Sequence, residues 1–135
     1  MHTKIILAFF LLNACLVSAQ ARSQTITPDQ ISTVIDTYNT NEARFISSYR
    51  GEKFEGQVTL AKVAASSMSE NSFIVYFDVN AQENYCDDIQ DKNMIKQLSS
   101  FDHGQQIFVT GLIEDVAFGQ LILKKCKFAT QKPKN

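Results

Sequence analysis

Carboxylate and amide side chains gather between residues 87 and 93, the densest run of potential oxygen ligands in the sequence: Asp87-Asp88-Ile89-Gln90-Asp91-Lys92-Asn93. Calcium takes roughly six to eight oxygen ligands in proteins, so this run is a candidate calcium site. It lacks the glycine and the distal glutamate of an EF-hand loop. We favour the alternative that Asp87 or Asp88 caps a following helix, where free N–H groups and the helix dipole stabilise a carboxylate. The sequence therefore predicts no bound metal and no cofactor.

His103 is the second of two histidines, and an imidazole can act as a general base. It directly precedes Gly104 in a predicted turn, and no cysteine nucleophile or serine elbow is spaced beside it. We expect a solvated turn histidine here. Because no nucleophile, base or metal set clusters anywhere in the sequence, we predict that the protein is not an enzyme.

Two aromatic residues and three lysines are candidates for a ligand face. Tyr76 and Phe108 are predicted to point outward from extended segments, and Lys124, Lys125 and Lys127 lie close together near the C-terminus. Surfaces that bind single-stranded nucleic acid combine aromatic platforms with a positive groove. Lysines on an edge strand also serve simply to discourage aggregation. The formal net charge of −1 does not indicate a polyanionic partner.

Residues 1–19 have the order of an export signal. A short basic start with Lys4 precedes the apolar run Ile5–Leu12, and Val17-Ser18-Ala19 supplies the small residues of a cleavage site. The apolar stretch is well short of the ~20 residues that span a bilayer. We predict cleavage near Ala19 and a periplasmic or secreted domain. The alternative is a lipoprotein signal in which Leu12-Asn13-Ala14-Cys15 is cut before Cys15, which then carries lipid.

Two cysteines, Cys86 and Cys126, remain after such a cleavage. An even number of cysteines in an exported protein favours a disulfide, because that compartment is oxidising. The alternatives are a metal site or a redox pair, although the two residues are far apart and form no CxxC motif. A bridge would close a loop worth roughly 4 kcal/mol in the chain-entropy model.

The first element expected to position these residues is a helix near the start of the mature chain. Residues 20–26 are predicted to be disordered, and Thr27, Pro28 and Gln30 then supply a capping box and a proline suited to a first turn. A helical apolar spacing follows in Ile31, Val34, Ile35 and Tyr38, is interrupted at residues 39–41, and resumes in Ala43, Ile46 and Tyr49.

From Lys53 onward, the spacing of apolar residues changes from the period of a helix to the two-residue period of a strand. Alternation predicts strands over residues 53–60 and 73–79, a short one at 84–86, and two more over 107–113 and 121–128. Residues 87–100 are predicted to form a helix or an ordered loop. The predicted core consists of the inward residues Phe54, Val58, Leu60, Phe73, Val75, Phe77, Ile107, Val109 and Leu123.

Five short strands with a helical segment between the third and fourth have the element order of the OB-fold, a small Greek-key barrel. We therefore predict a mainly β, five-stranded OB-fold barrel with an N-terminal helix. The predicted domain covers residues 27–129, and residues 130–135 form a basic C-terminal tail.

Several short motifs resemble those of the tRNA-anti-like OB-fold family of exported bacterial proteins, and they occur in the same order as in that family. Asn41-Glu42, Tyr49–Lys53 and Gly56-Gln57-Val58 resemble the opening of that family. Tyr85-Cys86, Gly104–Gly111 and Leu123–Cys126 resemble its third, fourth and last strands. The match covers roughly residues 40–128.

The resemblance implies a five-stranded barrel and an analogy with domains that bind tRNA anticodons. It implies no established activity and supplies no ligand residues. It does imply that the third and fifth strands run side by side, which would place Cys86 and Cys126 within reach of each other. We predict an exported, non-enzymatic OB-fold module that binds a protein, peptide, saccharide or small ligand. The alternative is single-stranded nucleic-acid binding through Tyr76, Phe108 and the C-terminal lysines, and we do not expect nucleic acid to be the partner.

Overall fold

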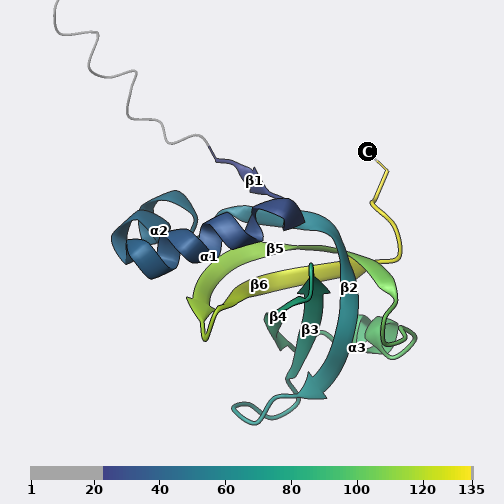
Figure 1. The fold of residues 1–135 in the computed structure, drawn as a ribbon. Coiled ribbons are helices and arrows are strands. Elements are labelled where there is room, and N and C mark those ends of the chain that lie inside the picture. Colours follow the sequence, from purple (N-terminus) through teal and green to yellow (C-terminus); the bar gives the residue numbers. More distant parts are fainter. Residues whose placement is uncertain (1–22, 135) are drawn as a thin grey trace, which may run out of the picture.

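The computed structural model of the protein describes residues 23–134, whose path is shown in Figure 1. The predicted leader at residues 1–19, its cleavage near Ala19 and the alternative lipid attachment at Cys15 lie outside the described residues. Among the described helices, none has the length and apolar character needed to cross a membrane.

The described chain begins with a short strand, β1 (Thr25–Ile26), which runs parallel to the start of β2 (Lys53–Ala65). Ile26 lies opposite Phe54 and is fully buried. The predicted disorder of residues 20–26 is therefore wrong for the last two, because backbone pairing and a buried side chain hold them in place.

Three helical segments follow: η1 (Pro28–Gln30), α1 (Ile31–Thr40) and α2 (Glu42–Ser48). At the first of them the Thr27 N–H donates to Gln30 Oε1 at 3.0 Å, as the predicted capping box requires. The break between α1 and α2 falls at Asn41, whose side-chain oxygen accepts a hydrogen bond from the Arg44 N–H at 3.0 Å and starts the second helix.

The predicted apolar stripe of the second helix is wrong at Ile46, which is 45% exposed, whereas Phe45 is fully buried. Because the chain bends at Asn41, α2 does not continue the face of α1. Phe45 instead packs edge-on against Tyr38 of α1, with ring centroids 5.3 Å apart.

The other strands are β3 (Phe73–Val79), β4 (Gln82–Ile89), β5 (Gln106–Ala117) and β6 (Gln120–Ala129). The strand order is β1-β2-β3-β4-β6-β5, and an additional β2–β5 pairing closes the barrel. The pair β4–β6 is parallel, whereas the other barrel pairs are antiparallel. This closed five-stranded barrel confirms the predicted OB-fold.

A short helix, α3 (Lys92–Leu98), lies between β4 and β5. Its N-terminal cap is Asp91, whose Oδ1 accepts from the Met94 N–H at 2.8 Å. The prediction that Asp87 or Asp88 caps this helix is wrong, because β4 extends to Ile89 and holds both aspartates in the strand.

The barrel core contains the inward residues that alternation predicted. Of the nine residues in that set, Phe73 is half-buried and packs against the core, and the others are buried. The register of β3 is therefore as predicted, with Val75 and Phe77 inside and Tyr76 outside.

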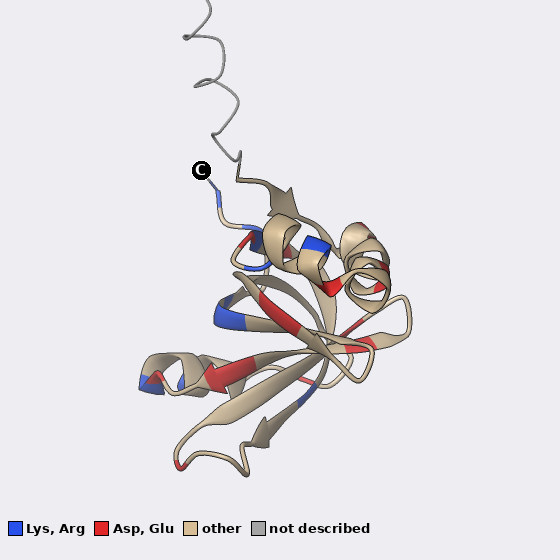
Figure 2. Ribbon diagram, turned by 90° about the vertical axis from the view of Figure 1, so that its left-hand side faces the viewer, with Lys and Arg blue, Asp and Glu red and all other residues tan. Residues whose placement is uncertain are grey.

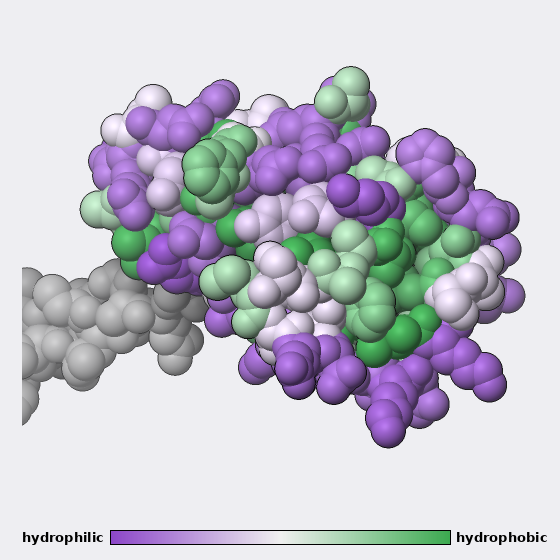
Figure 3. Space-filling model, turned by 90° about the horizontal axis from the view of Figure 1, so that it is seen from below, coloured by the Kyte–Doolittle hydropathy of each residue, from purple (hydrophilic) through white to green (hydrophobic). Residues whose placement is uncertain are grey.

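Helices cover opposite ends of this core. Figure 1 shows α1 and α2 together at one end and α3 at the other. Ile31, Val34 and Ile35 of α1 join the core, as does Leu98 of α3. Figure 3 views the α3 end from below and shows an apolar area there, bordered by hydrophilic side chains. The helices thus cover the ends of the barrel rather than the outer faces of its strands.

Candidate ligand-binding face

Two tyrosines lie side by side on the outside of the β3–β4 hairpin. Tyr76 and Tyr85 are directly opposite in the antiparallel register, and their ring centroids are 5.6 Å apart at an interplanar angle of 47°. Directly opposite side chains on one face are the natural contact pairs of a sheet. Both residues are half-buried, so the paired rings remain partly accessible to a ligand.

Lys62 of β2 completes this cluster. Its Nζ lies 4.8 Å from the centroid of the Tyr76 ring, within the range of a cation–π contact. We call Lys62, Tyr76 and Tyr85 the tyrosine face. A β-bulge between Leu60 and Lys62 precedes this contact and shifts the β2–β3 register.

The bulge in β2 also explains the position of His103. The His103 Nδ1 lies 2.5 Å from the carbonyl oxygen of Ala61, at the point where the register shifts. A ring nitrogen that carries a proton can donate to this carbonyl and satisfy it where the ladder is irregular. His103 is exposed and lies in a turn, as predicted, and its ring also contacts the bulge.

The surroundings of Tyr85 keep its phenol protonated. Burial raises the pKa of Tyr85 above its ordinary value of 10.0, and the carboxylate of Asp87, the phenol of Tyr76, and the carboxylates of Glu114 and Asp115 raise it further. At neutral pH Tyr85 is accordingly a neutral ring with a hydroxyl donor. Figure 2 shows that acidic and basic positions are interspersed over the barrel.

A groove of about 390 Å³ lies on the same side of β4, beginning at Asp87, two residues beyond Tyr85. Its walls carry both signs of charge, from Asp87, Asp88, Glu114, Lys124 and Lys125. Ser66, Ser69 and Ser72, in and beside the β2–β3 loop, add hydroxyl groups. The volume lies within the range of small-molecule sites, roughly 300–1,000 Å³.

Backbone irregularities in β4 and β6 create this groove. The two strands pair only through Tyr85 with Ile122 and Cys86 with Leu123. Beyond those pairs each strand contains a register shift and a residue with positive φ, Asp88 at 60° and Lys125 at 52°. Bulges bend strands and re-aim side chains, so β4 and β6 diverge here.

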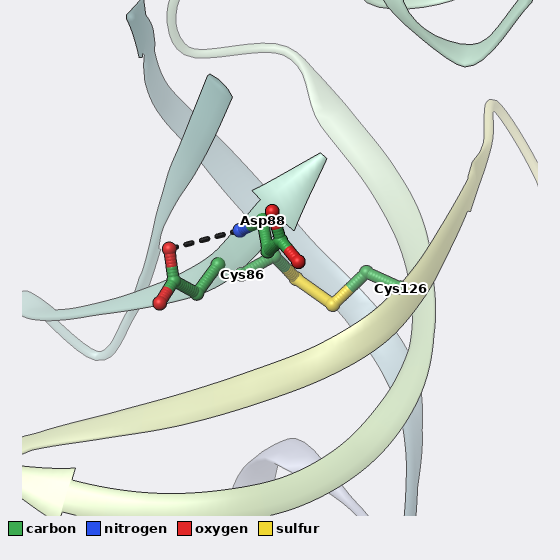
Figure 4. Close-up of a disulfide and its surroundings, with 4 residues drawn as sticks. Cys86, Asp88 and Cys126 are labelled. Atoms are coloured by element: carbon green, nitrogen blue, oxygen red, sulfur yellow. Dashed lines mark hydrogen bonds between the residues drawn. A yellow bond between two sulfur atoms is a disulfide. The ribbon is translucent and has the colours of Figure 1, made fainter. Parts of the chain in front are cut away.

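The disulfide lies where the two strands begin to diverge. Cys86 and Cys126 are bonded, with their Cα atoms 6.2 Å apart, and both are buried. Figure 4 shows the bond running from β4 to β6 beside Asp88. The predicted disulfide is confirmed, and it ties together the strands that flank the groove.

The predicted ligand-face residues do not form one surface. Tyr76 belongs to the tyrosine face, and Lys124 and Lys125 line the groove. Lys127 is exposed opposite Thr110 of β5 and does not line the groove. Phe108 is only 8% exposed, so the expectation that it offers a ring to a ligand is wrong.

The acidic run at residues 87–93 is occupied by hydrogen bonds within the protein. Asp88 Oδ1 accepts from Ser72 Oγ at 3.2 Å and from Gln90 Nε2 at 2.5 Å, while Asp91 caps α3. Within residues 23–134, no three of the histidine, cysteine, aspartate and glutamate side chains are grouped so as to hold a metal ion.

Sequence reasoning missed Tyr85 and Lys62. The signal for Tyr85 was its neighbour: if Cys86 points inward to form a disulfide, alternation places Tyr85 outside. No comparable signal existed for Lys62, because the bulge in β2 depends on how that strand pairs with β3.

The closed five-stranded barrel, with α1 and α2 at one end and α3 at the other, defines an OB-fold protein. No protein-family model matches the sequence, so membership of the tRNA-anti-like family is not confirmed. No curated protein matches it either.

Solved structures share the fold at low sequence identity. A putative nucleic acid-binding lipoprotein from Klebsiella pneumoniae is 14% identical with a TM-score of 0.58, and the match covers 87% of this chain and 97% of that one. A putative aspartyl-tRNA synthetase from Leishmania major is 9% identical with a TM-score of 0.50, covering 87% of this chain and 23% of that one. A replication protein A heterotrimer bound to ssDNA is 5% identical with a TM-score of 0.38, covering 55% and 52%.

These neighbours correct one sequence-based expectation. We did not expect nucleic acid to be the partner, yet a solved structure that shares the fold over most of this chain is described as a putative nucleic acid-binding lipoprotein. Net charge does not decide the ligand class, because a binding surface is set by its own side chains rather than by the total.

Proposed function

We propose that the mature chain is an exported, non-enzymatic binding module that takes its ligand on the tyrosine face and in the adjoining groove. The observation that carries this proposal is the pair of directly opposed, partly accessible rings of Tyr76 and Tyr85, 5.6 Å apart. OB-folds bind oligonucleotides and oligosaccharides on their second and third strands and on the flanking loops. Here those strands are β3 and β4, and residues of the β2–β3 loop line the groove.

Export is part of the same proposal. The order of basic, apolar and small residues in positions 1–19 supports a leader that is cleaved near Ala19. The likeness in fold to a lipoprotein candidate supports export and keeps attachment of lipid to Cys15 as the alternative. The disulfide suits an oxidising compartment.

Single-stranded nucleic acid is the second candidate ligand, and the tyrosine face favours it. Stacked aromatic rings beside a cation are what such proteins use to hold successive bases. Lys62 over the Tyr76 ring supplies that cation. The nucleic acid-binding description of the Klebsiella protein supports the same ligand class.

The experiment is a titration of the 15N-labelled mature domain, followed by NMR, with a short oligothymidylate, a neutral oligosaccharide and a basic peptide. We expect one of these ligands to shift the amide signals of β3 and β4. Tyr85→Ala should abolish the shifts, and Tyr85→Phe, which keeps the ring, is the matched control and should retain them. Ligand-induced shifts confined to other strands would contradict the proposal.

Charge removal separates the candidate ligands. Asp87 lies in the groove and acts on Tyr85, so its carboxylate faces any ligand on this surface. For a phosphate-bearing ligand, Asp87→Asn removes a repulsion and should strengthen binding, most clearly at low salt. For a neutral saccharide the same substitution should leave the affinity unchanged or lower it.

A further inference from the structure

The turn between β5 and β6 contains a residue that its backbone does not favour. Ala117 pairs with Gln120, leaving a two-residue turn in which Phe118 has φ 52° and Gly119 has φ 74°. Two-residue hairpin turns with positive φ at both positions prefer asparagine, aspartate or glycine at the first. A bulky side chain there is strained.

Burial does not compensate for this strain. Phe118 is fully exposed, at 103% of its reference area. The other exposed large apolar side chains of the described chain have smaller exposed fractions: Ile46 at 45%, Val63 at 37% and Met68 at 91%. Phe118 thus has both an unfavourable backbone conformation and an unfavourably exposed apolar side chain. Residues that persist in strained backbone tend to cluster at ligand-contacting sites.

Side-chain hydrogen bonds hold this turn beside the β3–β4 hairpin. Gln82 Nε2 donates to the Gly119 carbonyl at 2.9 Å, and Gln120 Nε2 donates to Glu83 Oε1 at 3.0 Å. Glu83 is two residues from Tyr85 and on the same face of β4. The turn therefore forms one end of the surface that carries the tyrosine face.

The distance between Phe118 and the tyrosine face sets the size of a ligand that can contact both. Ile122 lies opposite Tyr85, and Phe118 is four positions before Ile122 along the chain. At roughly 3.3 Å per residue, the Cα atoms of Phe118 and Ile122 are at most about 13 Å apart, and a strand spacing of about 4.8 Å separates Ile122 from Tyr85. A chain-like ligand whose first unit lies on the tyrosine pair can therefore reach Phe118 with its next units.

We propose that Phe118 is a third stacking residue of the ligand site, contacting a further base of a single-stranded nucleic acid whose first base lies on Tyr76 and Tyr85. This inference rests on the second candidate of the proposed function. Base–aromatic stacking tolerates any sequence, because every base has a π-face, and it suits an exposed ring at a loop tip. The hydrogen-bonded turn holds that ring at the edge of the face before the ligand binds.

The first test measures affinity for a fluorescent oligothymidylate of about ten nucleotides, within the usual site size of one OB-fold. Phe118→Asn removes the ring and introduces a residue that the turn prefers, so folding is not compromised. We expect binding to weaken roughly tenfold, the effect of losing one stacked base. The melting temperature should stay the same or rise. The matched control is Ile46→Gln, at an exposed apolar residue of α2 that lies outside the groove and the tyrosine face, and it should bind as the wild type does.

The second test reports the contact directly. The sequence contains no tryptophan, so Phe118→Trp places the protein's one tryptophan at the turn, where its emission can be excited apart from that of the tyrosines. Unlabelled oligothymidylate should quench it at concentrations that match the measured affinity. The control Ile46→Trp, on α2 and outside the groove, should show no such quenching.

The outcomes separate this inference from the proposed function. If Tyr85→Ala abolishes oligothymidylate binding but Phe118→Asn does not weaken it, the third stacking position is wrong and the tyrosine face stands. If the wild type does not bind oligothymidylate, the inference is overturned. In that case, oligosaccharide- or peptide-induced shifts at β3 and β4 would still support the binding module.

Discussion

The ring of Pro28 occupies the space that a side chain at Gly56 would need. A Cβ atom built at Gly56 collides with Cδ and Cγ of Pro28. The first helical turn therefore rests directly on the backbone of β2, and this contact fixes how η1 and α1 sit over the end of the barrel.

Gly56→Ala is expected to lower the free energy of unfolding by about 1–3 kcal/mol, the usual cost of overpacking. Chemical denaturation of the mature domain measures it. The substitution Pro28→Ala, combined with Gly56→Ala, should recover part of the loss, because it removes the atoms that collide. Equal losses with and without Pro28 would show that the two residues do not compete for this space.

Cys126→Ala is expected to lower stability by roughly 2–5 kcal/mol, the range for disulfides removed from small secreted domains. Without the bond, the unfolded chain gains conformational entropy. The bond also joins β4 and β6 where their pairing ends, so its loss removes the covalent link between the strands that flank the groove. Denaturation curves of Cys126→Ala and of Cys86→Ala should agree. Thiol titration of the unfolded, unreduced wild type should find neither Cys86 nor Cys126 free, and two reactive thiols would contradict the bond.

Ala81→Gly is expected to stabilise the protein by about 0.5–1 kcal/mol. Asn80 and Ala81 form the β3–β4 turn with φ of 50° and 64°, and glycine adopts the second of these conformations without strain. Ala117→Gly, at the end of β5 and without a positive φ, is the matched control and should be neutral or destabilising. A loss of stability for Ala81→Gly would contradict the turn geometry.

Tyr85 is expected to ionise above its ordinary pKa of 10.0. Because the folded protein then holds this proton to higher pH than the unfolded chain does, the contribution of Tyr85 to stability falls as the pH rises above about 10. Phenolate absorbance during an alkaline titration reports it. Tyr85→Phe should remove a component that titrates above pH 10.0, whereas loss of a component centred at pH 10.0 would show that burial and the neighbouring groups do not perturb Tyr85.

Export is checked by the intact mass of the protein recovered from outside the cytoplasm. Cleavage near Ala19 predicts a chain that starts near Gln20. A mass that begins at Cys15 with attached lipid would replace release of a free domain with lipid anchoring.

The sequence by itself determined the faces of the strands. The inward residues Val75 and Phe77 alternate with the less buried Ile74, Tyr76 and Asp78. Because side chains of a strand point to opposite sides in turn, this local period is enough to assign the core. The capping residues before α1 are equally local, and so is the order of elements that predicted the OB-fold. The disulfide followed from the cysteine count and from that fold together.

Only the tertiary structure decided where regular pairing ends. The bulges at Asp88 and Lys125 and the extension of β4 to Ile89 depend on partners far away in the sequence. Those features decided that Asp91 rather than Asp87 or Asp88 caps α3, and that β4 and β6 part to form a groove. The pairing of Tyr76 with Tyr85 depends on hairpin register, and the burial of Phe108 on packing between strands. Such contacts are non-local, so the order of residues along the chain carries no direct signal for them.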